Sequence, residues 1–258
     1  MAGGELKIDA RRQKILEILS RDGQVRVSRL SELLDATQVT IRSDLSALER
    51  DGYLERMQGG AVQTVKNYYN LDFQQRKQQN SAVKKRLASV VCDMIRDGDT
   101  LMINSGTTTY FVAVELKKRK NLNIVTNSLS VAVEMGGHPT FRVILLGGDI
   151  NAQYSFTYGA DAQEQLRRYR ADYAILSMDG LCPETGLTTY HAEEAVMDLL
   201  MMERSEHTIV AAESRKIGRE GFSRVGDAAR VNRLVTDSGI DHELARRLTA
   251  LGVEIKYC

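Results

Sequence analysis

The chain has 258 residues, of which 43% are hydrophobic and 27% charged, and its formal net charge is +1. This length and composition predict a soluble protein of two domains, and the near-zero charge argues against non-specific nucleic-acid binding as the main function. No apolar run reaches the length of a membrane span, the first residues lack the apolar stretch of a signal peptide, and the scattered cysteines and histidines predict a reducing cytoplasm without a metal site.

Two short helices are predicted near the N-terminus, after roughly seven residues that are expected to be disordered. The first covers residues 11–20 and carries a broad apolar stripe. After a short extended piece at residues 25–27, Ser28 is expected to cap the second helix, at residues 28–35. The leucines expected to face inward from it are Leu30, Leu33 and Leu34.

A third helix is predicted after Thr37, whose hydroxyl can cap it, and Gly52 suits the position just past its end. Its bulky apolar positions are Val39, Ile41, Leu45 and Leu48. Its polar face carries Gln38, Thr40, Arg42, Ser43 and Ser46. Short donors and acceptors with one guanidinium near a helix N-terminus suit base edges and phosphates in a major groove.

A hairpin is predicted after the third helix, because Gly59-Gly60 forms a turn flanked by apolar residues. Such a hairpin beside a recognition helix is a wing, and Arg56 would reach a phosphate or the minor groove. Residues 1–65 are therefore predicted to form a winged helix-turn-helix. An ordinary amphipathic helix and hairpin is the alternative that periodicity alone leaves open.

The charge along this part of the chain is uneven. Residues 1–65 contain ten Lys/Arg and ten Asp/Glu, whereas residues 66–86 contain six Lys/Arg and one Asp. The affinity for DNA would therefore come from a few specific contacts rather than from the net charge of the domain. Residues 66–81 are predicted as a linker that runs into a helix. The basic run can be explained as a linker whose charged side chains face solvent. The more specific alternative is that this segment lies beside the DNA-binding domain and contacts the DNA backbone.

From residue 82 onward, apolar strand-like runs alternate with helical segments. The predicted strands cover residues 100–104, 122–126, 141–146, 173–178, 207–212, 232–236 and 253–257. The helices between many of them cover residues 109–118, 128–135, 159–169, 191–204 and 241–251. This alternation predicts an α/β domain at residues 82–258, with a mostly parallel sheet covered on both faces.

The loops after these strands carry glycines, amides and small hydroxyl residues. Ligands of such sheets bind at the C-terminal ends of the strands, and residues 105–109 open a helix whose first N–H groups suit an anion. Helix caps and turns explain such residues without any ligand, but their recurrence on one edge favours a pocket for phosphate and hydroxyl groups. No dinucleotide or P-loop motif is present.

The chain resembles the DeoR family of bacterial transcriptional regulators over nearly its whole length, through RRQKILEIL, VTIRSDLSALERDGYLERMQGGAV, NSGTTT, VTNS, LLGGD, DGL…GLTT…EEAV and ESRKIGREGF. This resemblance implies a winged helix joined to a sensor domain that looks like ribose-phosphate isomerase. It also implies a repressor of sugar catabolism whose effector is a phosphorylated sugar or a related metabolite.

The resemblance assigns roles to individual residues. The DNA-contacting residues would be Gln38, Thr40, Arg42, Ser43 and, in the wing, Arg56. The effector phosphate would lie on Ser105, Gly106, Thr107, Thr108 and Thr109. The rest of the pocket would come from Asn127, Ser128, Gly148, Asp179, Gly180, Glu194 and Lys216, the last as the cation. Many members have arginine at Ser43 and aspartate at Asn104, so the operator and the effector stay open.

The leading prediction is a cytoplasmic, homo-oligomeric (dimeric or tetrameric) repressor that binds double-stranded operator DNA, needs no cofactor and is released by its effector. The alternative is an enzyme, a sugar-phosphate isomerase in which Asp179, Glu193 or Glu194 and Lys216 move protons. It is disfavoured, because residues 181–183, Leu-Cys-Pro, provide no second aspartate. A metabolite-binding protein that is not a regulator is a third reading. His191 is expected at a helix start on the surface, with a pocket position as the alternative.

Overall fold

The computed structural model of the chain describes residues 10–51, 53–63 and 73–258, without the side chains of Ser20, Arg21 and Gln63. The N-terminal segment predicted to be disordered, Gly52 and the first part of the predicted linker lie outside these residues. The chain divides into two units, Met1–Asn80 and Ser81–Cys258, and each is described by itself. No helix of the described parts is both long and apolar enough to cross a membrane.

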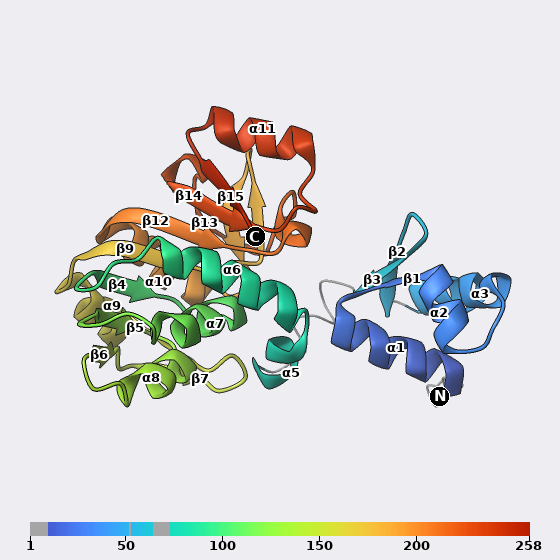
Figure 1. The fold of residues 1–258 in the computed structure, drawn as a ribbon, viewed down its shortest axis with the longest axis horizontal. Coiled ribbons are helices and arrows are strands. Elements are labelled where there is room, and N and C mark those ends of the chain that lie inside the picture. The colour runs from blue at the N-terminus through green and yellow to red at the C-terminus, as the bar shows by residue number, and fades with distance from the viewer. Residues whose placement is uncertain (1–9, 52, 64–72) are drawn as a thin grey trace, which may run out of the picture. The chain divides into compact units, whose positions relative to one another are not determined.

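The N-terminal unit combines helices with a small antiparallel sheet (Figure 1). Its helices are α1 (Ala10–Asp22), α2 (Val27–Leu33), α3 (Gln38–Arg50) and, inside the predicted linker, α5 (Phe73–Gln78). Its strands are β1 (Gln24–Arg26), β2 (Leu54–Met57) and β3 (Gly60–Gln63), in the order β1-β3-β2. The predicted helix-turn-helix and wing are therefore confirmed.

The predicted apolar stripes form the core of this unit. The fully buried side chains are Ile15, Leu19, Leu30, Ile41, Leu45, Leu48 and Leu54. Three details of the prediction are wrong. Arg26, not Ser28, occupies the N-cap position of α2, and Leu33 is 56% and Val39 72% exposed. Val39 precedes Ile41 by two positions, which places it on the opposite, exposed side of α3, and Leu33 is the last residue of α2.

The C-terminal unit is built on a seven-stranded sheet in which every neighbouring pair is parallel. The strands, in spatial order, are β15 (Glu254–Tyr257), β14 (Arg233–Thr236), β12 (Ser205–Ala211), β9 (Ala171–Leu176), β4 (Thr100–Ile103), β5 (Asn123–Thr126) and β6 (Arg142–Leu145). These are the seven strands predicted from the apolar runs, so the predicted parallel sheet is confirmed.

Helices cover both faces of this sheet. One face carries α6 (Ser81–Asp93), α7 (Thr107–Leu116) and α8 (Leu129–Gly136), and the other α9 (Ala160–Arg167), α10 (Ala192–Glu203) and α11 (His242–Ala250). In β4, Leu101 and Ile103 pack toward the first face and Met102 toward the second. Near-continuous apolar runs are required because alternate residues of each strand enter two different cores.

The chain order places a topological switch point at the middle of the sheet. From β4 the chain moves outward through β5 to β6, whereas from β9 it moves the other way through β12 and β14 to β15. Strands β4 and β9 are direct neighbours, so the direction of winding reverses between them. The loops after these two strands diverge, and such a switch point is where ligands of open α/β sheets bind.

Short antiparallel strands in the loops were not predicted. They are β7 (Asp149–Asn151) with β8 (Phe156–Tyr158), and β10 (Gly180–Cys182) with β11 (Gly186–Thr189) and β13 (Ser223–Gly226). Each has three or four residues, which is too short for a two-residue period to stand out from a turn-rich loop.

Candidate functional site

The exposed face of α3 is the first candidate site. Its exposed residues recur at helical spacing along one stripe, which consists of Val39, Arg42, Ser43 and Ser46. The guanidinium of Arg42 donates from Nη2 to Oε1 of Gln38 at 3.1 Å, one turn earlier. Two of the residues predicted to contact DNA are thus hydrogen-bonded to each other on the N-terminal half of the helix, which fixes the position of the guanidinium.

The N-terminus of α3 is capped as the sequence indicates. Oγ1 of Thr37 accepts from the backbone N–H of Thr40 at 3.2 Å, and the two hydroxyl oxygens lie 2.9 Å apart. The cap fixes the start of the helix. It also means that the Thr40 hydroxyl is hydrogen-bonded within the cap rather than directed only at solvent.

Arg56 joins the wing to α3. Its Nη1 donates to Oγ of Ser46 at 2.8 Å and to the backbone oxygen of Arg42 at 3.3 Å, and its Nε donates to the oxygen of Gly60 at 3.2 Å. Its backbone N–H donates to Oε1 of Glu49 at 2.9 Å. Arg56, which is predicted to contact DNA, therefore also holds the hairpin against the helix.

A buried carboxylate, which the sequence analysis did not single out, anchors α3 from its other side. Asp44 is 2% exposed and accepts from Nε of Arg11 at 2.5 Å and from Nε of Arg12 at 3.2 Å. Burial raises the pKa of Asp44, but the two arginines outweigh burial and the pKa lies below its usual value. The sequence signal was available, because Asp44 follows Ile41 and precedes Leu45 on the apolar face.

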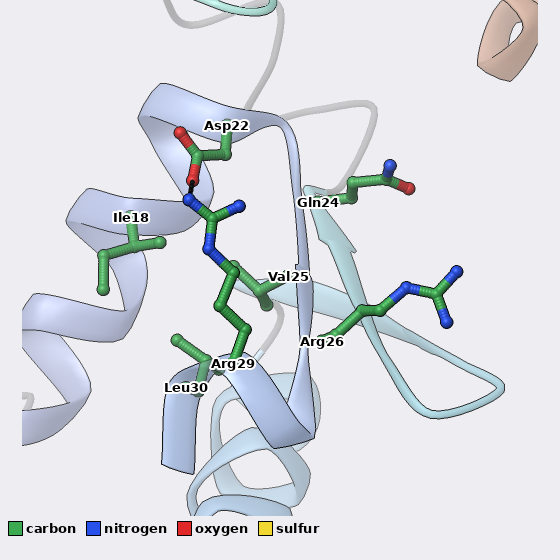
Figure 2. A pocket seen from close by; sticks show the side chains of 7 residues that line it. All are labelled: Ile18, Asp22, Gln24, Val25, Arg26, Arg29 and Leu30. Atoms are coloured by element: carbon green, nitrogen blue, oxygen red, sulfur yellow. Dashed lines mark ion pairs between the residues drawn. The ribbon is translucent and has the colours of Figure 1, made fainter. Parts of the chain in front are cut away.

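A pocket of about 140 Å³ opens between α1, β1 and α2 (Figure 2). Its lining residues are Ile18, Asp22, Gln24, Val25, Arg26, Arg29 and Leu30. Arg29 turns to Asp22, with Nη2 to Oδ2 at 3.6 Å, while Arg26 and Gln24 point away from this pair. The pocket is smaller than the roughly 300–1,000 Å³ typical of small-molecule sites, so it is too small for a whole sugar phosphate.

The second candidate site lies where β4 and β9 diverge. The side chain of Asn104 bridges the two strand ends: its Oδ1 accepts from the N–H of Ser177 at 3.0 Å and its Nδ2 donates to the oxygen of Ser177 at 2.8 Å. The same Nδ2 donates to Oδ1 of Asp198 on α10 at 3.0 Å. Asn104 thus connects the switch point to a helix on one face of the sheet.

The predicted anion site, residues 105–109, forms the turn between β4 and α7. Gly106 occupies the N-cap position of α7, where no side chain caps the first turn. A Cβ atom on Gly106 would lie 1.8 Å from Oγ of Ser177, so a side chain there would require the Ser177 hydroxyl in the loop after β9 to move. Thr107 and Thr108 are buried in the first turn, and Thr109 donates to the oxygen of Asn104 at 3.0 Å.

The β7–β8 hairpin covers this edge. Oγ of Ser105 donates to the oxygen of Tyr154 at 3.2 Å, and Nδ2 of Asn127 donates to the oxygen of Thr157 at 3.2 Å. Oδ1 of Asn127 is buried and has no hydrogen-bond partner among the described residues. Ser128 caps α8 through its hydroxyl, so the structure gives this predicted pocket residue a role in the fold.

Gly148, also predicted for the pocket, lies at the base of the same hairpin. Its φ is +137°, and a Cβ atom there would lie 2.3 Å from the oxygen of Tyr158. Gly180, at the start of β10, is enclosed in the same way, because a Cβ would lie 2.1 Å from the oxygen of Arg219. Both glycines are required by close approach of the backbone.

Carboxylates gather beyond the switch point. Oγ1 of Thr189 lies 3.1 Å from Oδ2 of Asp179 and 2.7 Å from Oε2 of Glu194. Burial, followed by the charge of Glu194, raises the pKa of Asp198 well above its usual value. Nζ of Lys216 donates to the oxygen of Met178 at 2.5 Å and lies 3.7 Å from Oδ1 of Asp179. Lys216 is thus placed at the acidic end of the site.

His191 lies at a helix start, as predicted, but it is less exposed than expected. It occupies the N-cap position of α10 and is only partly exposed. Its ring lies edge-on to the ring of Tyr154 at 4.4 Å between centroids, and to that of Tyr190 at 5.2 Å. The helix-start position is the one observed, and Tyr154, in the turn of the unpredicted β7–β8 hairpin, packs against the ring; a role for His191 in a pocket stays a prediction.

Comparisons with known proteins bear on both sites. The DeoR-like helix-turn-helix domain matches residues 11–66, and the DeoR C terminal sensor domain matches residues 79–238. The HTH-type transcriptional regulator YulB of Bacillus subtilis (strain 168) is 32% identical over 245 residues, 95% of both chains. The glycerol-3-phosphate regulon repressor of Escherichia coli (strain K12) is 28% identical over 253 residues, 98% of this chain and 100% of the relative.

A further relative and a solved structure extend this picture. The lactose phosphotransferase system repressor of Lactococcus lactis subsp. lactis is 30% identical over 233 residues, 89% of this chain and 91% of the relative. Ribose 5-phosphate isomerase from Plasmodium falciparum is 15% identical, with a TM-score of 0.41 over 55% of each chain. A structural likeness of that degree carries no conclusion about chemistry.

Proposed function

Because the chain belongs to the DeoR family of transcriptional regulators, we propose that it represses a sugar-catabolism operon by inserting α3 into the major groove of its operator. The observation that supports this most directly is the exposed stripe on α3, with Arg42 held by Gln38 at 3.1 Å. Family membership also sets aside the isomerase and the non-regulatory alternatives.

The proposed contacts divide into two kinds. Gln38, Arg42 and Ser43 read base edges, because they lie at the N-terminal half of α3, which enters the groove in helix-turn-helix proteins. Arg26 and Arg29, beside the pocket next to α2, contact phosphates, because the helix before the recognition helix crosses the backbone. Arg56 holds the wing at the groove edge. These few arginines can contact DNA even though the formal charge of the whole N-terminal domain is close to zero.

Arg42→Ala is expected to weaken operator binding about 10- to 100-fold, the loss expected for one good base or phosphate contact. Affinity is measured by fluorescence anisotropy on operator DNA between 50 and 200 mM salt, conditions in which phosphate contacts are resolved. Arg246→Ala is the matched control, since it removes the same charge from an exposed position on α11. Normal binding by Arg42→Ala at moderate salt would contradict the placement of α3.

The effector is proposed to be a phosphorylated sugar or a related metabolite bound at the β4–β9 switch point. Its phosphate would lie at the uncapped N-terminus of α7, where helix N–H groups favour anions. Its hydroxyl groups would reach acceptors such as Oδ1 of Asn127 and the carboxylate of Asp179. The names of two relatives, which mention glycerol 3-phosphate and a lactose phosphotransferase system, are consistent with this class. The β7–β8 hairpin is proposed to open for entry, because Ser105 and Asn127 are buried and hydrogen-bonded to it.

Thr108→Val is expected to lower effector affinity about tenfold or more while operator binding stays unchanged. It removes one hydroxyl donor to a charged group, worth about 1.5–3 kcal/mol, and keeps the shape of a buried residue. A panel of sugar phosphates is first tested for release of labelled operator, and the active compound is titrated against both proteins. Equal affinities, or release by none of the panel, would contradict the proposed effector site.

The organisation of the protein is proposed as well. Residues 1–65 form the DNA-binding domain, residues 66–81 the linker and residues 82–258 the sensor. We place the regulator in the cytoplasm, together with its operator. A homo-oligomer is expected, because paired recognition helices match half-sites about one helical turn apart. The effector then acts by favouring one arrangement of these pairs over another.

A further inference from the structure

Val39 is an apolar side chain displayed on the surface through which the protein is proposed to meet DNA. It is 72% exposed, whereas Ile41 and Leu45 of the same helix are fully buried. Its two neighbours along the stripe, Arg42 and Ser43, follow at three and four positions and are also exposed. A single exposed apolar residue needs no explanation by itself, but Val39 is exposed on the face of α3 that is proposed to meet DNA.

Its position is the first turn of α3. Gln38 begins the helix after the Thr37 cap, so Val39 is its second residue. In helix-turn-helix proteins, residues of the first turns of the recognition helix meet the base edges. Gln38 and Arg42, which flank Val39 before and after, are hydrogen-bonded to each other. Val39 therefore occupies an apolar position beside a polar pair on the same side of the helix.

Valine presents a defined apolar surface there. Its branched Cβ leaves essentially one χ1 rotamer in a helix, so both methyl groups point in a fixed direction and little entropy is lost on contact. Among the groups that the major groove displays, only the 5-methyl group of thymine is apolar. The edge of a base that carries hydrogen-bond donors or acceptors would lose its bound water against Val39 without gaining a hydrogen-bond partner.

We propose that Val39 is a specificity-determining residue that reads the 5-methyl group of a thymine in each operator half-site. This proposal rests on the proposed DNA-binding function, and it adds a base preference that the polar residues of α3 do not provide. Leu33, at the end of α2, is also exposed, at 56%, but it does not belong to the α3 stripe and serves as the control.

The test begins with the full-length protein selecting operator sequences from random duplex DNA. Each thymine of the selected half-site is then replaced in turn by deoxyuridine, which removes only the methyl group. Binding is measured for the unchanged protein, Val39→Ser and Leu33→Ser. At one thymine, uracil should weaken binding by the unchanged protein and by Leu33→Ser about three- to fivefold, as expected for one buried methyl group, and should leave Val39→Ser unaffected.

Each outcome has a distinct meaning. If every uracil-sensitive thymine is equally sensitive with Val39→Ser, or if none is sensitive, the assignment of Val39 is overturned. If the unchanged protein selects no sequence, the proposed DNA-binding function itself fails. Val39→Thr, which keeps one methyl group, should retain part of the sensitivity. Unfolding temperatures equal to that of the unchanged protein would establish that these exposed substitutions leave the fold intact.

Discussion

Gly60→Ala is expected to unfold the winged-helix module and to abolish operator binding. A Cβ atom on Gly60 would lie 2.0 Å from the backbone oxygen of Val25, where β3 pairs with β1 at Arg26. No side-chain rotation relieves a clash with backbone, so the two strands must separate. A cost of about 3 kcal/mol, the upper end for overpacking, is most of the stability of so small a module.

The neighbouring glycine provides a matched control. Gly59 has φ +77°, but nothing lies within 4 Å of a Cβ built on it. Gly59→Ala should therefore cost only about 1–2 kcal/mol, the penalty of a left-handed backbone for a residue with a side chain. Thermal unfolding followed by circular dichroism, together with operator binding, separates the two. The close packing of β1 against β3 would be wrong if Gly60→Ala were no more damaging than Gly59→Ala.

Asp44→Asn is expected to destabilise the same module by about 2 kcal/mol. The amide is close in shape to the carboxylate but loses the charge that Arg11 and Arg12 contact at 2.5 and 3.2 Å. Hydrogen bonds to charged groups are worth about 1.5–3 kcal/mol, and the upper part of that range is discounted because the arginine side chains are 39% and 32% exposed. Since Asp44 lies on α3, operator binding should weaken with stability.

The pH dependence of this effect has a definite sign. The two arginines, against the opposing effect of burial, hold the pKa of Asp44 below its usual value in the folded protein. Its contribution is therefore fully present above the unfolded pKa, about 3.9, and is lost as the pH falls through the lower folded pKa. The difference in unfolding temperature between Asp44→Asn and the unchanged protein should be constant from pH 8 to 6 and shrink in acid.

Asp35→Asn is the control for this comparison. Asp35 is an exposed turn residue of the same module with φ +46°, a conformation that asparagine also tolerates. Its substitution removes the same charge and should change the unfolding temperature little at any pH. If Asp35→Asn and Asp44→Asn behaved alike, net charge rather than the arginine anchor would explain the effect.

Three contacts together fix the position of α3 in the N-terminal unit. Thr37 fixes its first turn, Asp44 ties its buried side to α1, and Arg56 ties its exposed side to the wing. The first contact lies within the cap of α3, and the other two join the helix to different parts of the module. The helix that we propose to read DNA is therefore held before any DNA is bound, so less conformational freedom is lost on binding.

The elements with strong periodicity could be predicted from the sequence alone. The seven strands of the parallel sheet and the helix from Gln38 to Arg50 follow from runs of apolar residues, because burial on two faces or on one stripe imposes a recognisable period. The polar loop residues at the C-terminal ends of the strands could also be found. Their roles toward DNA and effector stay predictions.

Only the tertiary structure decided which of these residues meet. The position of Asp44 on the apolar face indicates burial but not its partners, which are arginines from α1, and Asp198 is buried beside Asn104, which follows a strand far away in the chain. Val39 was grouped with the apolar positions of α3, but it lies two residues before Ile41 and therefore on the opposite side of the helix. Periodicity is a local property of the chain, whereas burial and partners are set by segments distant in sequence.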